Sequence, residues 1–189
     1  MSGANKSGYI LTVLMLPIRS NTGCILRETV DPCSMLMKGL AEHDAQLSAI
    51  LEDPTCFPVV LWPAESEARP SVSVENLRLQ VGARRVVLIA VDGTWRNARK
   101  MVARMPSSVS RLDLGSEIVG EGESLLAPIR FRGHSSGEDD SRKVCTAEAV
   151  VGAMIAFGLA EVDGRYILDV AERKVDLIRR YRGHRSKNE

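Results

Sequence analysis

Clustered cysteines and histidines are missing from this sequence. The four cysteines stand alone, without a Cys-x-x-Cys pair, and there are only three histidines. Structural zinc sites and disulfide frameworks need several such residues at short, regular spacings. We therefore expect reduced thiols, most of which serve for packing, and no bound metal.

Long apolar runs and a secretory leader are also missing. No stretch approaches the roughly 18 consecutive apolar residues of a membrane-spanning helix. The N-terminal MSGANKSGY has no charged start, apolar core or cleavage site of the kind found in signal peptides. We expect residence in the cytosol or, as the alternative, in the nucleus, and no membrane partner.

An excess of charge of one sign is absent as well, because the net charge is +1. This value neither requires nor excludes a nucleic-acid partner, so the distribution of charge is more informative than its sum. Lys and Arg are concentrated in two predicted helices, one of which is a basic C-terminal helix and tail at about 165–189. The length of 189 residues is that of one domain, predicted to span residues 1–189.

Apolar patterns along the chain predict alternating strands and helices. Predicted strands are 9–16, 58–62, 86–91 and 109–114, with a strand edge at 127–132 and a hydrophilic loop at 133–143. Predicted helices are 34–52, about 74–80, 95–105, 145–161 and 165–183. This alternation is typical of an α/β layer fold with a mostly parallel sheet flanked by helices.

The stretch VVLIAVDGTWRNARKMVARM, residues 86–105, joins a buried strand directly to a basic amphipathic helix. Ligands of open α/β sheets bind outside the carboxyl ends of strands, which is where Asp92 lies. An Asp at this position suits two roles, a helix N-cap or a catalytic carboxylate. Gly93 permits positive φ or close approach by a ligand, and Trp95 suits a core anchor as well as a ligand contact.

A second candidate motif, CTAEA at residues 145–149, begins the next predicted helix. Glu148 is placed to complete a capping box, with Cys145 or Thr146 as the cap. The same residues offer backbone N–H groups, a hydroxyl and a carboxylate, and helix N-termini hold carboxylates or phosphates well. The motif therefore fits either a plain helix start or part of a ligand site.

The two motifs together, DGTW followed by R-N-A-R-K and then CTAEA about fifty residues later, resemble the DTW-domain family. Members of that family are tRNA-uridine aminocarboxypropyltransferases, related in fold to the SPOUT class of S-adenosylmethionine-dependent RNA enzymes. The resemblance extends from the first strand to about residue 160 and includes, more loosely, the segments Leu61-Trp62-Pro63 and R-S-N-T-G. Two features differ: no cysteine-rich segment precedes Tyr9, and Cys145 stands where the family usually has Ser.

The resemblance implies a SPOUT-like fold and transfer of the 3-amino-3-carboxypropyl group from S-adenosylmethionine to N3 of a tRNA uridine. SPOUT-like sites commonly hold the cofactor in a knotted loop, which sequence patterns alone do not predict. The implied catalytic residues are Asp92, Thr94 and Trp95, with Asp92 as general base or as the group that orients the uracil. The implied cofactor-binding residues are Trp62, Pro63, Gly93, Arg130, Cys145, Thr146, Ala147 and Glu148. Phosphate contacts are expected from Arg96, Arg99 and Lys100, and another basic patch contains Arg179, Arg180, Arg182 and Arg185.

Two other functions remain compatible with these residues. A methyltransferase of the same fold would bind the same cofactor rotated, so that the methyl group faces the acceptor. A non-catalytic RNA-binding module would keep the fold and the basic surfaces alone. Oligomeric state, the tRNA and the modified position do not follow from the sequence.

Overall fold

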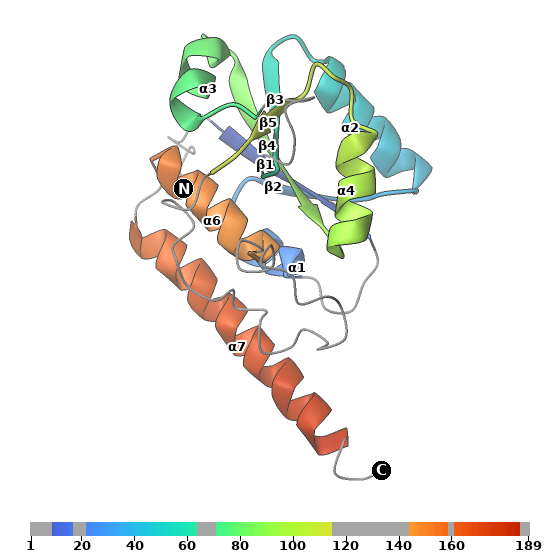
Figure 1. Ribbon diagram of the computed structural model, residues 1–189, viewed down its shortest axis with the longest axis vertical. Helices are drawn as coiled ribbons and strands as arrows, with labels where there is room; N and C mark the ends of the chain where they lie inside the picture. Colours follow the sequence, from blue (N-terminus) through green and yellow to red (C-terminus); the bar gives the residue numbers. More distant parts are fainter. Residues whose placement is uncertain (1–8, 17–21, 64–70, 115–143, 159–160, 186–189) are drawn as a thin grey trace, which may run out of the picture.

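The computed structural model describes residues 9–16, 22–63, 71–114, 144–158 and 161–185 (Figure 1). The strands are β1 (Tyr9–Met15), β2 (Cys33–Met37), β3 (Cys56–Leu61), β4 (Arg85–Asp92) and β5 (Ser110–Leu112). The helices are α1 (Gly23–Thr29), α2 (Ala41–Glu52), α3 (Val74–Val81), α4 (Trp95–Ala103), α6 (Thr146–Ala156) and α7 (Glu161–Arg185). The fold is therefore α/β, as predicted.

All five strands form one parallel sheet in the order β2-β1-β4-β3-β5. The central strand β4 is buried along almost its whole length, which explains its unbroken apolar run. Its last residue, Asp92, lies opposite Met15 at the end of β1. Because the strands are parallel, the residues that follow them meet at one edge of the sheet, in an arrangement consistent with a SPOUT-like fold.

Two hydrophobic clusters cover the two faces of the sheet. Alternate residues of β4 divide between them: Leu88 and Ala90 join one cluster, and Val87 and Ile89 join the other. The first cluster packs α1, α3 and α6 against the sheet, and α7 lies over α1 and α6. The second cluster packs α2 and α4 against the opposite face. Asp92 continues the face of Leu88 and Ala90, which directs its side chain toward α1 and α6.

The predicted helix 34–52 is wrong in its first part. Residues Cys33–Met37 form the edge strand β2, paired in parallel with β1, and only Ala41–Glu52 is helical. Gly39 separates the two with φ of 96°, a conformation that interrupts a helix. The pairing of backbone N–H and C=O groups with β1 overrides the local helical spacing of the apolar residues.

Other boundaries shift by a few residues, and one element was not predicted. The short helix α1 begins at the glycine of the R-S-N-T-G segment, while α6 is shorter than the predicted 145–161 and α7 begins before the predicted 165. The predicted strand edge 127–132 and loop 133–143 lie outside the described residues. Among the helices described, none has both the length and the apolar character needed to cross a membrane.

Candidate functional site

Thr94, not Asp92, is the N-cap of α4. The Thr94 Oγ1 accepts a hydrogen bond from the Asn97 N–H at 3.4 Å, in the usual geometry of a capping hydroxyl. Gly93 is not among the described glycines that have positive φ, which are Gly39, Gly82 and Gly158. The capping role considered for Asp92 is thus taken by another residue, and its carboxylate is available for other contacts.

The Asp92 carboxylate is buried, with 4% of the residue exposed, and it joins three elements. Its Oδ2 accepts a hydrogen bond from the Gly23 N–H at the start of α1, at 2.9 Å. Its Oδ1 accepts a hydrogen bond from the Thr146 hydroxyl at the start of α6, at 2.8 Å. Strand β4 and the N-termini of two helices therefore converge on one carboxylate. Helix N-termini favour negative charge, so the arrangement suits an anionic side chain or ligand.

Gly23 allows this close approach because it has no side chain. A Cβ at position 23 would lie 2.5 Å from Asp92 Oδ2 and 2.9 Å from Val13 Cγ1, both well inside van der Waals contact. Any other residue at position 23 must therefore displace the carboxylate or the start of α1. Thr22, immediately before it, is 2% exposed, and its Oγ1 lies beside the Cys145 thiol.

The start of α6 is organised by the CTAEA motif. The Cys145 N–H donates to Glu148 Oε2 at 2.5 Å, the reciprocal bond of a capping box. With Glu148 in that role, the Thr146 hydroxyl is free to donate to Asp92 and is not needed as a cap. Burial, and then the charge of Glu148, raises the pKa of the Cys145 thiol to about 12. A pKa this high suits a thiol that stays neutral and packs in the core.

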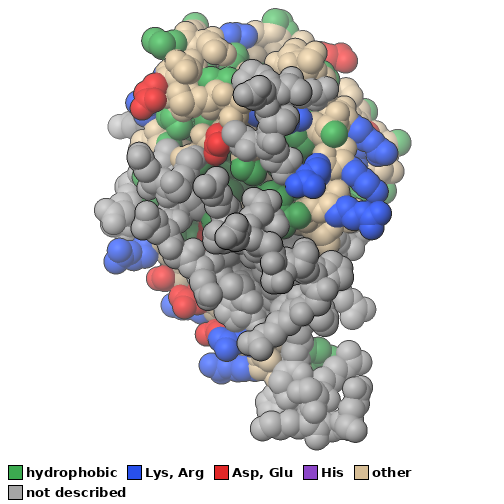
Figure 2. Space-filling model, viewed as in Figure 1, with side chains coloured by type: hydrophobic (Ala, Val, Ile, Leu, Met, Phe, Trp, Pro, Cys, Tyr) green, Lys and Arg blue, Asp and Glu red, His purple; other side chains and the backbone are tan. Residues whose placement is uncertain are grey.

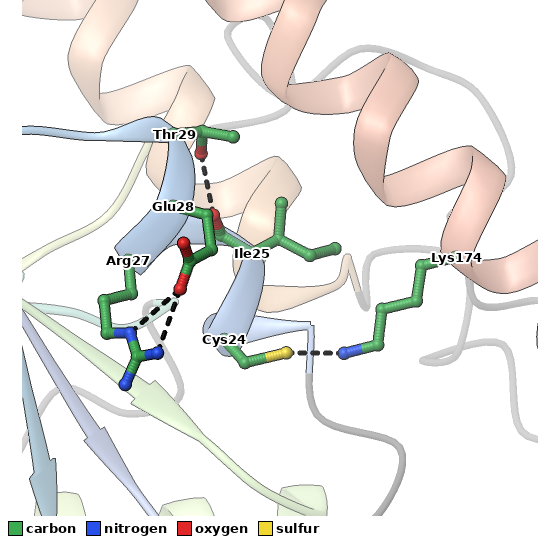
Figure 3. Close-up of polar contacts among 6 residues, drawn as sticks. All are labelled: Cys24, Ile25, Arg27, Glu28, Thr29 and Lys174. Atoms are coloured by element: carbon green, nitrogen blue, oxygen red, sulfur yellow. Dashed lines mark hydrogen bonds and ion pairs between the residues drawn. The ribbon is translucent and has the colours of Figure 1, made fainter.

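The surroundings of Asp92 act on the pKa of its carboxyl in opposite directions. Burial raises the pKa of the Asp92 carboxyl, while the hydrogen bonds from Thr146 and Gly23 and the positive charge of Lys174 lower it. Lys174 reaches this region from α7, where its Nζ donates to the Cys24 Sγ at 2.6 Å (Figure 3). The net direction is upward, which makes this carboxylate a stronger base than an exposed aspartate.

The two tryptophans lie on the other face of the sheet. Trp62 is 5% exposed and Trp95 is partly buried, and their ring centroids are 5.4 Å apart with planes inclined at 55°. Both pack in the cluster beneath α2 and α4, whereas Asp92 is directed toward α1 and α6. A tilted aromatic pair of this kind anchors the start of α4 at the same edge of the sheet. Pro63, which follows Trp62, is exposed.

The basic residues of α4 lie on its outer face. Arg96, Arg99 and Lys100 are exposed, as is Arg104 just after the helix, and α4 contains no acidic residue. Figure 2 shows Lys and Arg side chains gathered on the side of the molecule where α4 lies. Arg130 lies outside the described residues.

The structure therefore brings together Asp92 and the residues Cys145, Thr146, Ala147 and Glu148, and it separates the two tryptophans from them. Sequence reasoning missed Gly23 and Lys174, which come from α1 and α7. The segment R-S-N-T-G gave a signal for the first, since it ends in a glycine directly before an apolar helical turn. No local pattern marks Lys174, because its place depends on how α7 packs.

Comparison with known protein families identifies the family to which this chain is similar. The family model described as DTW domain matches residues 18–178, which include β4, α4 and both motifs. No curated protein and no solved structure matches this chain.

Proposed function

Because this chain belongs to the DTW domain family, the family of tRNA-uridine aminocarboxypropyltransferases, we propose that it transfers the 3-amino-3-carboxypropyl group of S-adenosylmethionine to N3 of a uridine in tRNA. Family membership supports a tRNA-modifying transferase. The buried, doubly hydrogen-bonded carboxylate of Asp92 is the observation that carries the specific reaction.

The reaction needs a base, because N3 of uridine is a weak acid that attacks only after losing its proton. Asp92 accepts that proton in our proposal, and the raised pKa of its carboxyl suits the task better than an ordinary aspartate would. Gly23 and Thr146 hold the two carboxylate oxygens in fixed positions, so the base is preorganised.

S-adenosylmethionine, when bound, supplies a carbon activated by the adjacent sulfonium, so that the carbon–sulfur bond breaks as the bond to N3 forms and methylthioadenosine leaves. The residues at the corner fit its charged amino-acid end. The first-turn N–H groups of α6, at Thr146 and Ala147, have no partners within the helix and suit a carboxylate. The buried Thr22 hydroxyl adds a further polar group beside the Cys145 thiol.

The remaining cofactor contacts stay proposals based on the family resemblance. Gly93, Pro63 and Arg130 are assigned to the cofactor, and Trp62 acts by supporting Trp95. Trp95 and Thr94, the other two catalytic residues implied by the family, lie at the same edge of the sheet as Asp92, with Trp95 packed on the opposite face. Thr94 already caps α4, so its contribution is the placement of the turn that carries Gly93.

The outer face of α4 is the proposed site for the tRNA backbone. Arg96, Arg99 and Lys100 lie on the helix that starts three residues after Asp92, and no acidic side chain in α4 neutralises them. Phosphates that contact these cations would place the RNA next to the corner, and binding would weaken steeply with salt.

The decisive experiment supplies unmodified tRNA with S-adenosylmethionine labelled either in the carboxyl or in the methyl group. We expect label to enter RNA from the carboxyl-labelled cofactor alone. The Asp92→Asn variant should lose this transfer, and Asp169→Asn, which changes an exposed aspartate of α7, should retain it. Entry of the methyl label would instead show a methyltransferase. Tight tRNA binding without entry of either label would show a non-catalytic RNA-binding module.

A further inference from the structure

Charge is distributed unevenly along α7. Residues 161–176 carry five acidic side chains and three basic ones, whereas residues 177–185 carry four arginines and no acid. The acids of the first part are Glu161, Asp163, Asp169, Glu172 and Asp176, and the arginines of the last part are Arg179, Arg180, Arg182 and Arg185. Basic residues in a last turn favour the helix dipole, but only by a few tenths to about 1 kcal/mol each. That effect alone does not explain four of them together.

Most of the described side chains in the basic part of α7, at residues 177–181, are exposed. Arg179 and Arg180 are exposed, and Leu177 before them and Tyr181 after them have 66% and 69% of their surfaces in solvent. Figure 1 shows these last turns running beyond the sheet and the other helices. The first part of the helix is anchored, since Ile167, Ala171 and Val175 belong to the buried core. The end of α7 thus presents cations and an aromatic ring on a supported helix.

We propose that the turns of α7 around Arg180 and Tyr181 form a second RNA-contacting surface, which binds phosphates and stacks on an unpaired base away from the catalytic corner. This inference rests on the RNA partner of the proposed function. Arginine next to an exposed aromatic ring is the combination that holds single-stranded RNA. A second copy of the chain fits this surface less well, because a two-fold contact here would bring the arginines of both copies together.

The position of α7 connects this surface to the corner. Lys174 lies in the anchored part of α7, next to Val175, and it contacts Cys24, the neighbour of Gly23 in α1 (Figure 3). RNA held at the end of α7 would therefore be held by the same helix that packs against α1 and α6, the two helices whose first residues bond Asp92. The tRNA would then contact the protein at two separate surfaces, the outer face of α4 and the end of α7.

The test compares three single variants by fluorescence anisotropy with labelled, unmodified tRNA over a range of salt concentrations. Arg180→Gln should weaken binding about 5- to 8-fold at 0.1 M salt and reduce the slope of log K against log salt by about 0.7 to 0.9, the effect of one phosphate contact. Tyr181→Ala should weaken binding by at least about 5-fold, and Tyr181→Phe, which keeps the ring, should bind as the wild type does.

Arg173→Gln is the matched control, because Arg173 is exposed on the same side of α7, two turns earlier and among acidic residues. Equal effects of Arg173→Gln and Arg180→Gln, or no effect of Arg180→Gln and Tyr181→Ala in proteins with wild-type helix content, would overturn the inference. The inference would also be overturned if the wild type were a dimer that these variants convert to a monomer. Tighter binding of the wild type to anionic vesicles than to tRNA would overturn it as well. If the wild type binds and modifies tRNA while Arg180→Gln and Tyr181→Ala bind it equally tightly, the proposed function stands and the α7 surface does not.

Discussion

The Gly23→Ala substitution tests whether the contact between α1 and Asp92 organises the site. The new Cβ would lie 2.5 Å from Asp92 Oδ2, about 1 Å closer than ordinary contact, so either the carboxylate or the start of α1 must move. Loss of the hydrogen bond to a charged group costs about 1.5–3 kcal/mol, and overpacking adds about 1–3 kcal/mol. Alanine has a higher helix propensity than glycine, which offsets up to about 1 kcal/mol of the lost stability. The expected net loss is about 2–5 kcal/mol.

For a chain of this size, such a loss lowers Tm by roughly 4–20 °C. Movement of the base by about 1 Å should also reduce aminocarboxypropyl transfer by about 100-fold. Thermal unfolding and the label-transfer assay measure the two effects, with Gly164→Ala as the control. A Cβ at Gly164 meets the apolar Val151 Cγ1 at 3.0 Å, so that variant should lose some stability and keep its turnover per folded molecule. A Gly23→Ala variant with the same Tm and the same transfer rate as the wild type would refute the reasoning.

Three further predictions concern single side chains. Thr146→Val removes the donor to Asp92 Oδ1 and should reduce transfer about 10- to 100-fold, whereas Thr146→Ser should retain it; equal rates in both variants would contradict this. Burial raises the pKa of Asp92 above its ordinary value near 3.8, so the stability associated with the neutral carboxyl is complete below that pH and is lost as pH rises through the raised pKa. In urea unfolding, the free energy of unfolding of Asp92→Asn should rise relative to that of the wild type from pH 4 to pH 8. A difference between the two free energies that does not change with pH would be evidence against a raised pKa. Thr12→Val should raise Tm by roughly 2–4 °C, because the fully buried Thr12 hydroxyl has no partner among the described residues; a lower Tm would show that a bound water satisfies it.

The central strand and the corner after it were predictable because their signals are local. A run of β-branched residues without alternation is what a strand with two covered faces requires, and helical spacing begins again at Trp95. The alternation of elements was enough to predict a parallel α/β sheet. These features depend on residues that are neighbours in the sequence.

Edge strand β2 and the partners of Asp92 were less predictable because they depend on distant residues. Cys33–Met37 becomes a strand by pairing with β1, and its own sequence fits a helix about as well. The contact between Gly23 and Asp92 joins residues 69 positions apart, and Thr146 lies 54 positions from Asp92. The family motifs indicated that DGTW and CTAEA work together, but the hydroxyl as the direct link emerges only from the packing of α6 on the sheet.

Burial of Asp92 restricts how an RNA substrate reaches it. A carboxylate in a residue that is 4% exposed cannot meet N3 of a uracil that remains stacked in RNA, so the proposed reaction requires the nucleotide to leave its stack. Unstacking and unpairing a base costs a few kcal/mol, and contacts elsewhere must offset this cost. The corner itself offers few groups for that purpose, since Gly23 and Thr146 are already bonded to Asp92. A buried base therefore requires RNA contacts outside the corner to offset the cost of unstacking, and the basic surfaces on α4 and at the end of α7 supply them.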